Sequence, residues 1–135
     1  MPDTIPTTNQ SSTPSVREAL PLDALNHIVL KSGAHPRRSL DTLCILEAVA
    51  WVAGRAHSDH PPCVSPTIAA FLRAWNDAMN DEDRQMLKPL IPLVIGTVST
   101  PELELQRSWM ALDWYCRVST PALLRLADLN AEADA

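Results

Sequence analysis

The chain has 135 residues, of which 46% are hydrophobic and 20% are charged. This is the composition of one globular domain, and it excludes a collagen-like or a wholly disordered protein. Eleven Lys and Arg against sixteen Asp and Glu give a net charge of −5. Because no basic run is present, the chain lacks the positive surface that a phosphate backbone requires, and no nucleic-acid partner is expected.

The first residues carry neither the positive charge nor the apolar run of a secretory signal. No stretch approaches the roughly 18 consecutive apolar residues of a membrane span, so no membrane attachment is expected. The three cysteines, Cys44, Cys63 and Cys116, are an odd number. Together these features favour reduced thiols in a cytoplasmic protein over a disulfide framework.

Residues 1–14 are mostly Thr, Ser, Pro, Asn and Gln. They offer little apolar surface to bury, and we expect a disordered tail. A helix is predicted over about 22–31, with Gly33 at its C-terminal end. Ser39 or Asp41 is expected to cap a second helix, whose apolar residues recur every three or four positions.

Three Ser/Thr-Pro pairs announce further helices, because a hydroxyl N-cap followed by proline is a frequent helix start. They are Ser65-Pro66, Thr100-Pro101 and Thr120-Pro121. The first helix is strongly amphipathic. The second has apolar residues at helical spacing, Leu105, Trp109, Leu112 and Cys116, with Glu104, Asp113 and Arg117 placed for pairs three and four residues apart.

Between these helices, Asn80 or Asp81 is expected to cap a helix that Pro89 and Pro92 then kink or break. The chain shows no alternating pattern and no hairpin turn signal, which argues against a sheet. The sequence therefore predicts an all-α fold, a compact bundle of five or six helices. One domain is expected over 15–130, followed by a frayed end at 131–135.

The densest group of reactive side chains lies between two predicted helices and contains His57, Asp59, His60 and Cys63. With Cys44, it supplies two thiols and two imidazoles, a ligand set that suits tetrahedral zinc. The spacing fits no standard zinc pattern, because no Cys-x-x-Cys knuckle is present. We therefore favour a rigid polar connection without a cofactor, with zinc as the alternative.

Cys44 could also act as a nucleophile, since the first turn of a helix lowers the pKa of a thiol. His60 would then serve as the base, with Asp59 or Glu47 orienting it. No glycine-rich oxyanion loop lies near Cys44. A buried core thiol is the favoured interpretation, with a Cys/His-dependent hydrolytic site as the alternative.

Glu47 lies on an otherwise apolar helix, where a carboxylate is costly to bury unless it is paired. We expect a structural role for Glu47, with His57, Arg55 or Arg107 as its partner. His35 stands alone in the sequence and is expected to be solvated.

Trp109, Trp114 and Tyr115 fall within seven residues, so they cannot all face one core. One or two of them should lie near the surface, where aromatic side chains can anchor a partner. With Asp113 and Arg117, the last two form the predicted binding surface. The partner is expected to be another protein, and a second copy of the chain is possible.

Two patterns carry a resemblance to a known group: Cys44-x-x-Glu47-Ala48, and Ser58-Asp59-His60-Pro61-x-Cys63-x-Ser65-Pro66. The chain resembles small uncharacterised proteins from bacteria and their phages over about residues 44–127. The resemblance implies a cytoplasmic helical domain and supplies no catalytic role. The expected function is therefore a non-enzymatic protein-binding or regulatory module, which the resemblance would make phage-related.

Overall fold

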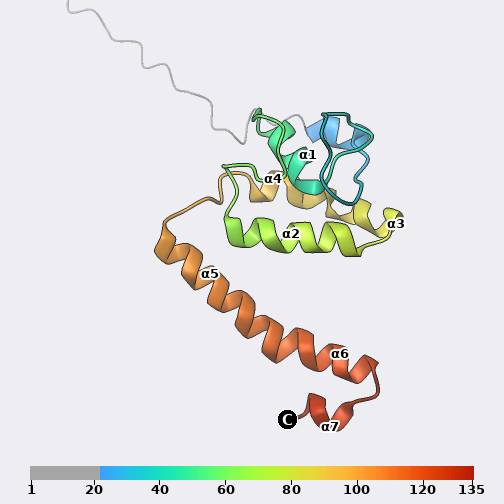
Figure 1. Cartoon of the computed structure of the whole chain (residues 1–135), viewed down its shortest axis with the longest axis vertical. Helices are drawn as coiled ribbons and strands as arrows, with labels where there is room; N and C mark the ends of the chain where they lie inside the picture. The colour runs from blue at the N-terminus through green and yellow to red at the C-terminus, as the bar shows by residue number, and fades with distance from the viewer. Residues whose placement is uncertain (1–21) are drawn as a thin grey trace, which may run out of the picture.

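The computed structural model describes residues 22–135. Within them the structure is helical and contains no strand, apart from an isolated parallel bridge between Leu30 and Leu43. The predicted all-α class is confirmed. The predicted tail, residues 1–14, lies outside the described residues. Two parts are evident in Figure 1: a head, residues 22–98, and a helical arm, residues 101–126, that projects from it.

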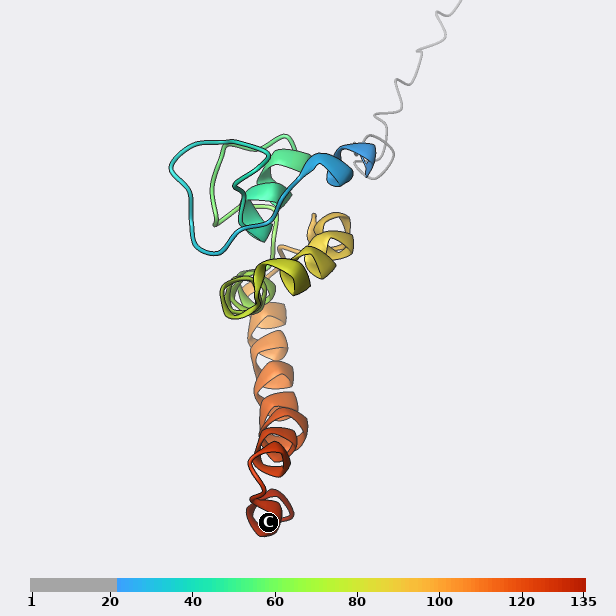
Figure 2. The ribbon, with the colours of Figure 1, turned by 90° about the vertical axis from the view of Figure 1, so that its right-hand side faces the viewer.

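The head contains one 3₁₀ helix, two α-helices of two turns or more, and a run of three short helical segments that follow one another directly. α1 packs against both α2 and α4. Figures 1 and 2 both place α1 on one side of α2 and the arm on the other. The bounds are η1 Leu22–His27, α1 Ile45–Val52, α2 Pro66–Ala78, α3 Asp81–Arg84, η2 Gln85–Leu90 and α4 Ile91–Val94.

The core is centred on α1, whose side chains are almost all buried. The start of α1 differs from the prediction, which placed the N-cap at Ser39 or Asp41. Cys44 is the N-cap instead, because Leu43 is held in extended backbone by its bridge to Leu30. The pairing of these two distant segments delays the helix by several residues.

Other helix boundaries follow the predicted caps. The side chains of Ser65 and Thr100 accept hydrogen bonds from backbone N–H groups three residues on, and Asn80 caps α3. The helix predicted over 22–31 is shorter, a 3₁₀ helix that ends at His27. As expected, the region of the two prolines is a broken helix, formed by η2 and α4.

The arm consists of α5 (Pro101–Trp114), a π-helical turn η3 (Tyr115–Ser119) and α6 (Thr120–Leu126). A new helix start at Thr120-Pro121 was predicted, and this is wrong: Ser119 and Thr120 both have helical dihedral angles, and the helix continues through them. Pro121 lacks an N–H and crowds the preceding turn. The π turn, in which Thr120 N–H bonds to the carbonyl of Tyr115, accommodates the proline by widening the helix.

The arm contributes no buried residue to the structure, so compact packing is confined to the head. After α6, where a frayed end was expected, the chain forms one further helical turn, α7 (Asn130–Ala133), that packs back on α6. Arg125 and Asp134 form an ion pair of 2.6 Å across this contact. Among residues 22–135, no helix combines the length and the apolar character that a membrane crossing requires.

Candidate functional site

Cys44 lies in the core, 4% exposed, at the N-terminus of α1. Its sulfur accepts a hydrogen bond from the backbone N–H of Glu47 at 3.4 Å. Burial outweighs this hydrogen bond and raises the pKa of the Cys44 thiol to about 12. At neutral pH the side chain is therefore a neutral thiol, which is a poor nucleophile.

The other members of the predicted cluster have separate surroundings. His60 is exposed, and its Nδ1 lies 2.8 Å from Asp59 Oδ1; this hydrogen bond holds the pKa of Asp59 below its ordinary value. Cys63 is buried, and its carbonyl accepts hydrogen bonds from the N–H groups of Gly96 and Val98. Among residues 22–135, no three His, Cys, Asp or Glu side chains are placed to hold a metal ion together.

A buried hydrogen-bond network surrounds Glu47, which is 1% exposed. Its Oε2 accepts from the backbone N–H of Cys44 (2.8 Å) and lies 2.9 Å from His35 Nδ1. Its Oε1 accepts from the backbone N–H of His35 (2.5 Å) and lies 3.7 Å from His57 Nε2. The expected partner His57 is therefore present, whereas the expectation of a solvated His35 is wrong.

His35 approaches Glu47 because the loop before α1 folds back over the start of that helix. His57, from the loop after α1, donates from Nε2 to the carbonyl of His35 (2.7 Å), so the two loops are joined. Glu47 thus ties both loops to the helix they flank. Because the carboxylate is fully covered, its role in this arrangement is structural.

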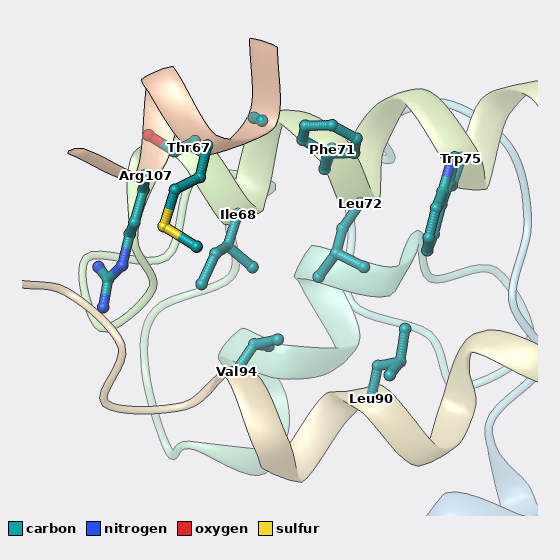
Figure 3. A pocket seen from close by; sticks show the side chains of 10 residues that line it. Thr67, Ile68, Phe71, Leu72, Trp75, Leu90, Val94 and Arg107 are labelled. Carbon is teal, nitrogen blue, oxygen red and sulfur yellow. The ribbon is translucent and has the colours of Figure 1, made fainter. Parts of the chain in front are cut away.

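An apolar groove of about 370 Å³ lies where α5 meets α2 and α4. Figure 3 shows Ile68 and Leu72 of α2 directed toward Val94 and Leu90 on its far side. Apart from Thr67 and Arg107, the groove is lined by apolar side chains. Its lining residues are Thr67, Ile68, Phe71, Leu72, Trp75, Leu90, Val94, Arg107, Met110 and Ala111.

The groove continues along the junction of α2 and the arm in two further hollows of about 410 Å³ each. Phe71 stands at their centre, with edge-on contacts to Trp75 (6.2 Å between ring centroids) and Trp114 (6.3 Å). Trp75 and Trp114 nevertheless remain more than two-fifths exposed. The predicted surface residue Trp114 is therefore part of an aromatic cluster that stays open on one side.

The arm beyond this junction exposes most of its apolar side chains. Sixteen large hydrophobic residues are exposed in the described part of the chain, and eleven of them lie in the arm or in the segment that follows it to residue 129. These eleven are Leu103, Leu105, Trp109, Met110, Leu112, Trp114, Tyr115, Val118, Leu123, Leu126 and Leu129. A helix that is apolar on several faces is expected to be buried, and this one is not.

The row of apolar residues that the sequence places at helical spacing on α5 lies in the open. Leu105 is 58%, Trp109 63% and Leu112 49% exposed. The contacts of α5 with the head come from another face, through Glu104, Arg107 and Ala111. We call the open row formed by Leu105, Trp109, Leu112 and Cys116 the arm seam.

Polar contacts fix the root of the arm to the head. The hydroxyl of Ser65 donates to Glu104 Oε2 at 2.5 Å, and Arg107 donates to the carbonyl of Thr97 at 2.6 Å and to Glu104 Oε1 at 2.5 Å. The hydrogen bond from Ser65 holds the pKa of Glu104 below its ordinary value. The direction in which the arm leaves the head is therefore set by specific contacts.

The remaining predicted surface residues lie along the middle of the arm. Arg117 donates to Asp113 at 2.5 Å across one helical turn, and both side chains are exposed. Tyr115 is 53% exposed. Sequence analysis missed Met110 and Ala111 as groove residues, although their spacing of three and four from Arg107 placed all three on one side of the helix.

No protein-family model matches the chain, and neither a curated protein nor a solved structure matches it.

Proposed function

We propose that the chain is a cytoplasmic, non-enzymatic protein-binding module whose binding surface is the arm together with the groove beside α2. The observation that carries this proposal is that the arm buries no residue, while the arm and the segment that follows it to residue 129 expose eleven large apolar side chains. Exposed patches of this extent mark interaction surfaces in other proteins. Tyr and Trp, present here as Trp109, Trp114 and Tyr115, are the residue types that most often anchor interfaces.

The apolar area is large enough to drive association. Eleven such side chains at about half exposure leave roughly 900 Å² of apolar surface in water, taking full side chains at roughly 150–200 Å². Covering that area is worth about 20 kcal/mol before costs. The loss of rotational and translational freedom on binding costs roughly 4–15 kcal/mol, so a net gain remains.

The surroundings of the reactive side chains favour binding over catalysis. A thiol whose pKa burial raises to about 12 supplies almost no thiolate at neutral pH, and Glu47 is committed to backbone and imidazole donors. Three free cysteines fit the reducing interior of a cell. These features support a module that works through its surface.

Photo-crosslinking tests the proposal. A benzophenone amino acid is placed at Trp109 of the arm in the full chain, and the same residue is placed at Glu82, an exposed position on the head. After irradiation of the cells that make the protein, we expect a discrete protein adduct from position 109 and none from position 82. No adduct from position 109, or equal adducts from both positions, would contradict the proposal.

A further inference from the structure

Resting on the proposed function, we propose that the occupant of the arm seam is a second copy of this chain, paired antiparallel through the same seam. The seam residues are separated by four, three and four positions: Leu105, Trp109, Leu112 and Cys116. This is the alternation with which two helices interlock side chains in a left-handed pair. The spacing selects a helix as the occupant.

Antiparallel pairing matches large side chains with small ones. With the twofold axis between Trp109 and Leu112, each Trp109 lies against the partner's Leu112, and each Leu105 lies against the partner's Cys116. A parallel pair would instead place Trp109 against the partner's Trp109 at the centre. Since a twofold interface uses the same patch on both copies, one seam suffices to build it.

The charges of the arm complement each other in the antiparallel arrangement. Residues 101–112 carry Glu102, Glu104 and Arg107, one net negative charge, whereas residues 113–126 carry Asp113, Arg117 and Arg125, one net positive charge. Antiparallel pairing brings the negative half of one arm beside the positive half of the other. A parallel pair would set each half beside its own sign.

The flanks of the seam contain no like charges that would oppose this pairing. Gln106, Ser108, Asp113 and Tyr115 border the seam. In the antiparallel register, Asp113 lies near the partner's Gln106, and Ser108 lies near the partner's Tyr115. Both pairs can form hydrogen bonds.

Self-pairing would cover three large apolar side chains that α5 leaves in water. Leu105 is 58%, Trp109 63% and Leu112 49% exposed, and these three form the apolar centre of the seam. Residues 1–21 of the chain are an inferior occupant, because they contain few large apolar residues among several prolines. A copy of the arm supplies the matching surface in full.

Sedimentation equilibrium of the full chain tests the inference. We expect twice the chain mass of 14.8 kDa at tens of micromolar. The variant Leu105→Glu should weaken association at least 100-fold, because it places a carboxylate in the seam. The matched control is Leu93→Glu on α4, since Leu93 is 61% exposed and Leu105 58%; the control should remain dimeric. Circular dichroism verifies that both variants are folded.

A monomeric wild-type chain, or a Leu105→Glu variant that associates as well as Leu93→Glu does, would overturn the inference. The proposed function has its own separate test. A monomer whose position 109 crosslinks to a protein of different mass would leave the binding function standing and refute self-pairing. A monomer without any adduct from position 109 would refute both.

Discussion

Replacing Glu47 by Gln decides whether the buried carboxylate is structural. Glutamine has the same shape, but it retains only one acceptor oxygen. If that oxygen takes the place of Oε2, it keeps the hydrogen bonds of Cys44 N–H and His35 Nδ1. The new NH₂ group then faces the backbone N–H of His35, which in the native protein donates to Oε1 at 2.5 Å.

The magnitude follows from these three contacts. A buried N–H left without an acceptor costs roughly 1–3 kcal/mol, and each hydrogen bond that changes from charged to neutral loses roughly 1 kcal/mol. The expected loss for Glu47→Gln is therefore about 3–5 kcal/mol in the free energy of unfolding. Small domains have total stabilities of roughly 5–15 kcal/mol, so the change is readily measured.

Equilibrium unfolding in urea, followed by circular dichroism, provides the assay. Glu82→Gln is the matched control: the side chain of Glu82 is exposed in the first turn of α3, and its replacement should cost less than about 1 kcal/mol. A loss for Glu47→Gln no larger than that of the control would refute the network described for this carboxylate.

Three further outcomes follow from the structure. Cys116 is exposed in the single chain and should react with a thiol reagent at pH 8 at concentrations low enough for the monomer, whereas the buried Cys44 and Cys63 should react only on unfolding. A pKa raised from 9.0 to about 12 lowers the thiolate fraction of Cys44 about 1,000-fold, so early modification of Cys44 would contradict its placement. The N–H of Gly33 donates to Asp77 and holds the pKa of this carboxyl group below its ordinary 3.8. The ionised Asp77 therefore stabilises the fold fully above pH 3.8, and this contribution is lost as the pH falls through the lower pKa of the folded state. The urea concentration at the unfolding midpoint should decrease when the pH is lowered below about 4, and Asp77→Asn should make that decrease smaller. Elemental analysis of the purified chain should give no stoichiometric zinc, and about one zinc per chain would instead support a metal site.

The sequence predicted helix starts where local chemistry decides them. Ser65 and Thr100 act as N-caps because a hydroxyl followed by proline needs no help from distant residues. The same signal at Thr120 was misleading, since a helix already in progress can absorb a proline by a π turn. The start of α1 was also beyond prediction, because it depends on a bridge between Leu30 and Leu43.

The candidate site was predictable only in part. The apolar row that begins at Leu105 was evident from its spacing, but the sequence does not reveal whether such a row faces the chain's own core or a partner. The partnership of Glu47 with His35 depends on how a loop folds back, which no local pattern encodes. The open aromatic contact of Phe71 with Trp114 likewise arises from the angle at which the arm leaves the head.

Disulfide formation offers the most direct test of antiparallel pairing through the arm seam. In the antiparallel pair, Leu105→Cys places a thiol opposite the partner's Cys116, so mild oxidation should give a covalent dimer in high yield. The wild-type chain is the control, because its two Cys116 residues would be displaced by roughly 16 Å along the helix axis, eleven residues, in addition to the spacing between the two helices. A covalent dimer from the Leu105→Cys variant alone is the predicted result; efficient crosslinking of the wild type through Cys116, or no crosslink in either protein, would contradict the account.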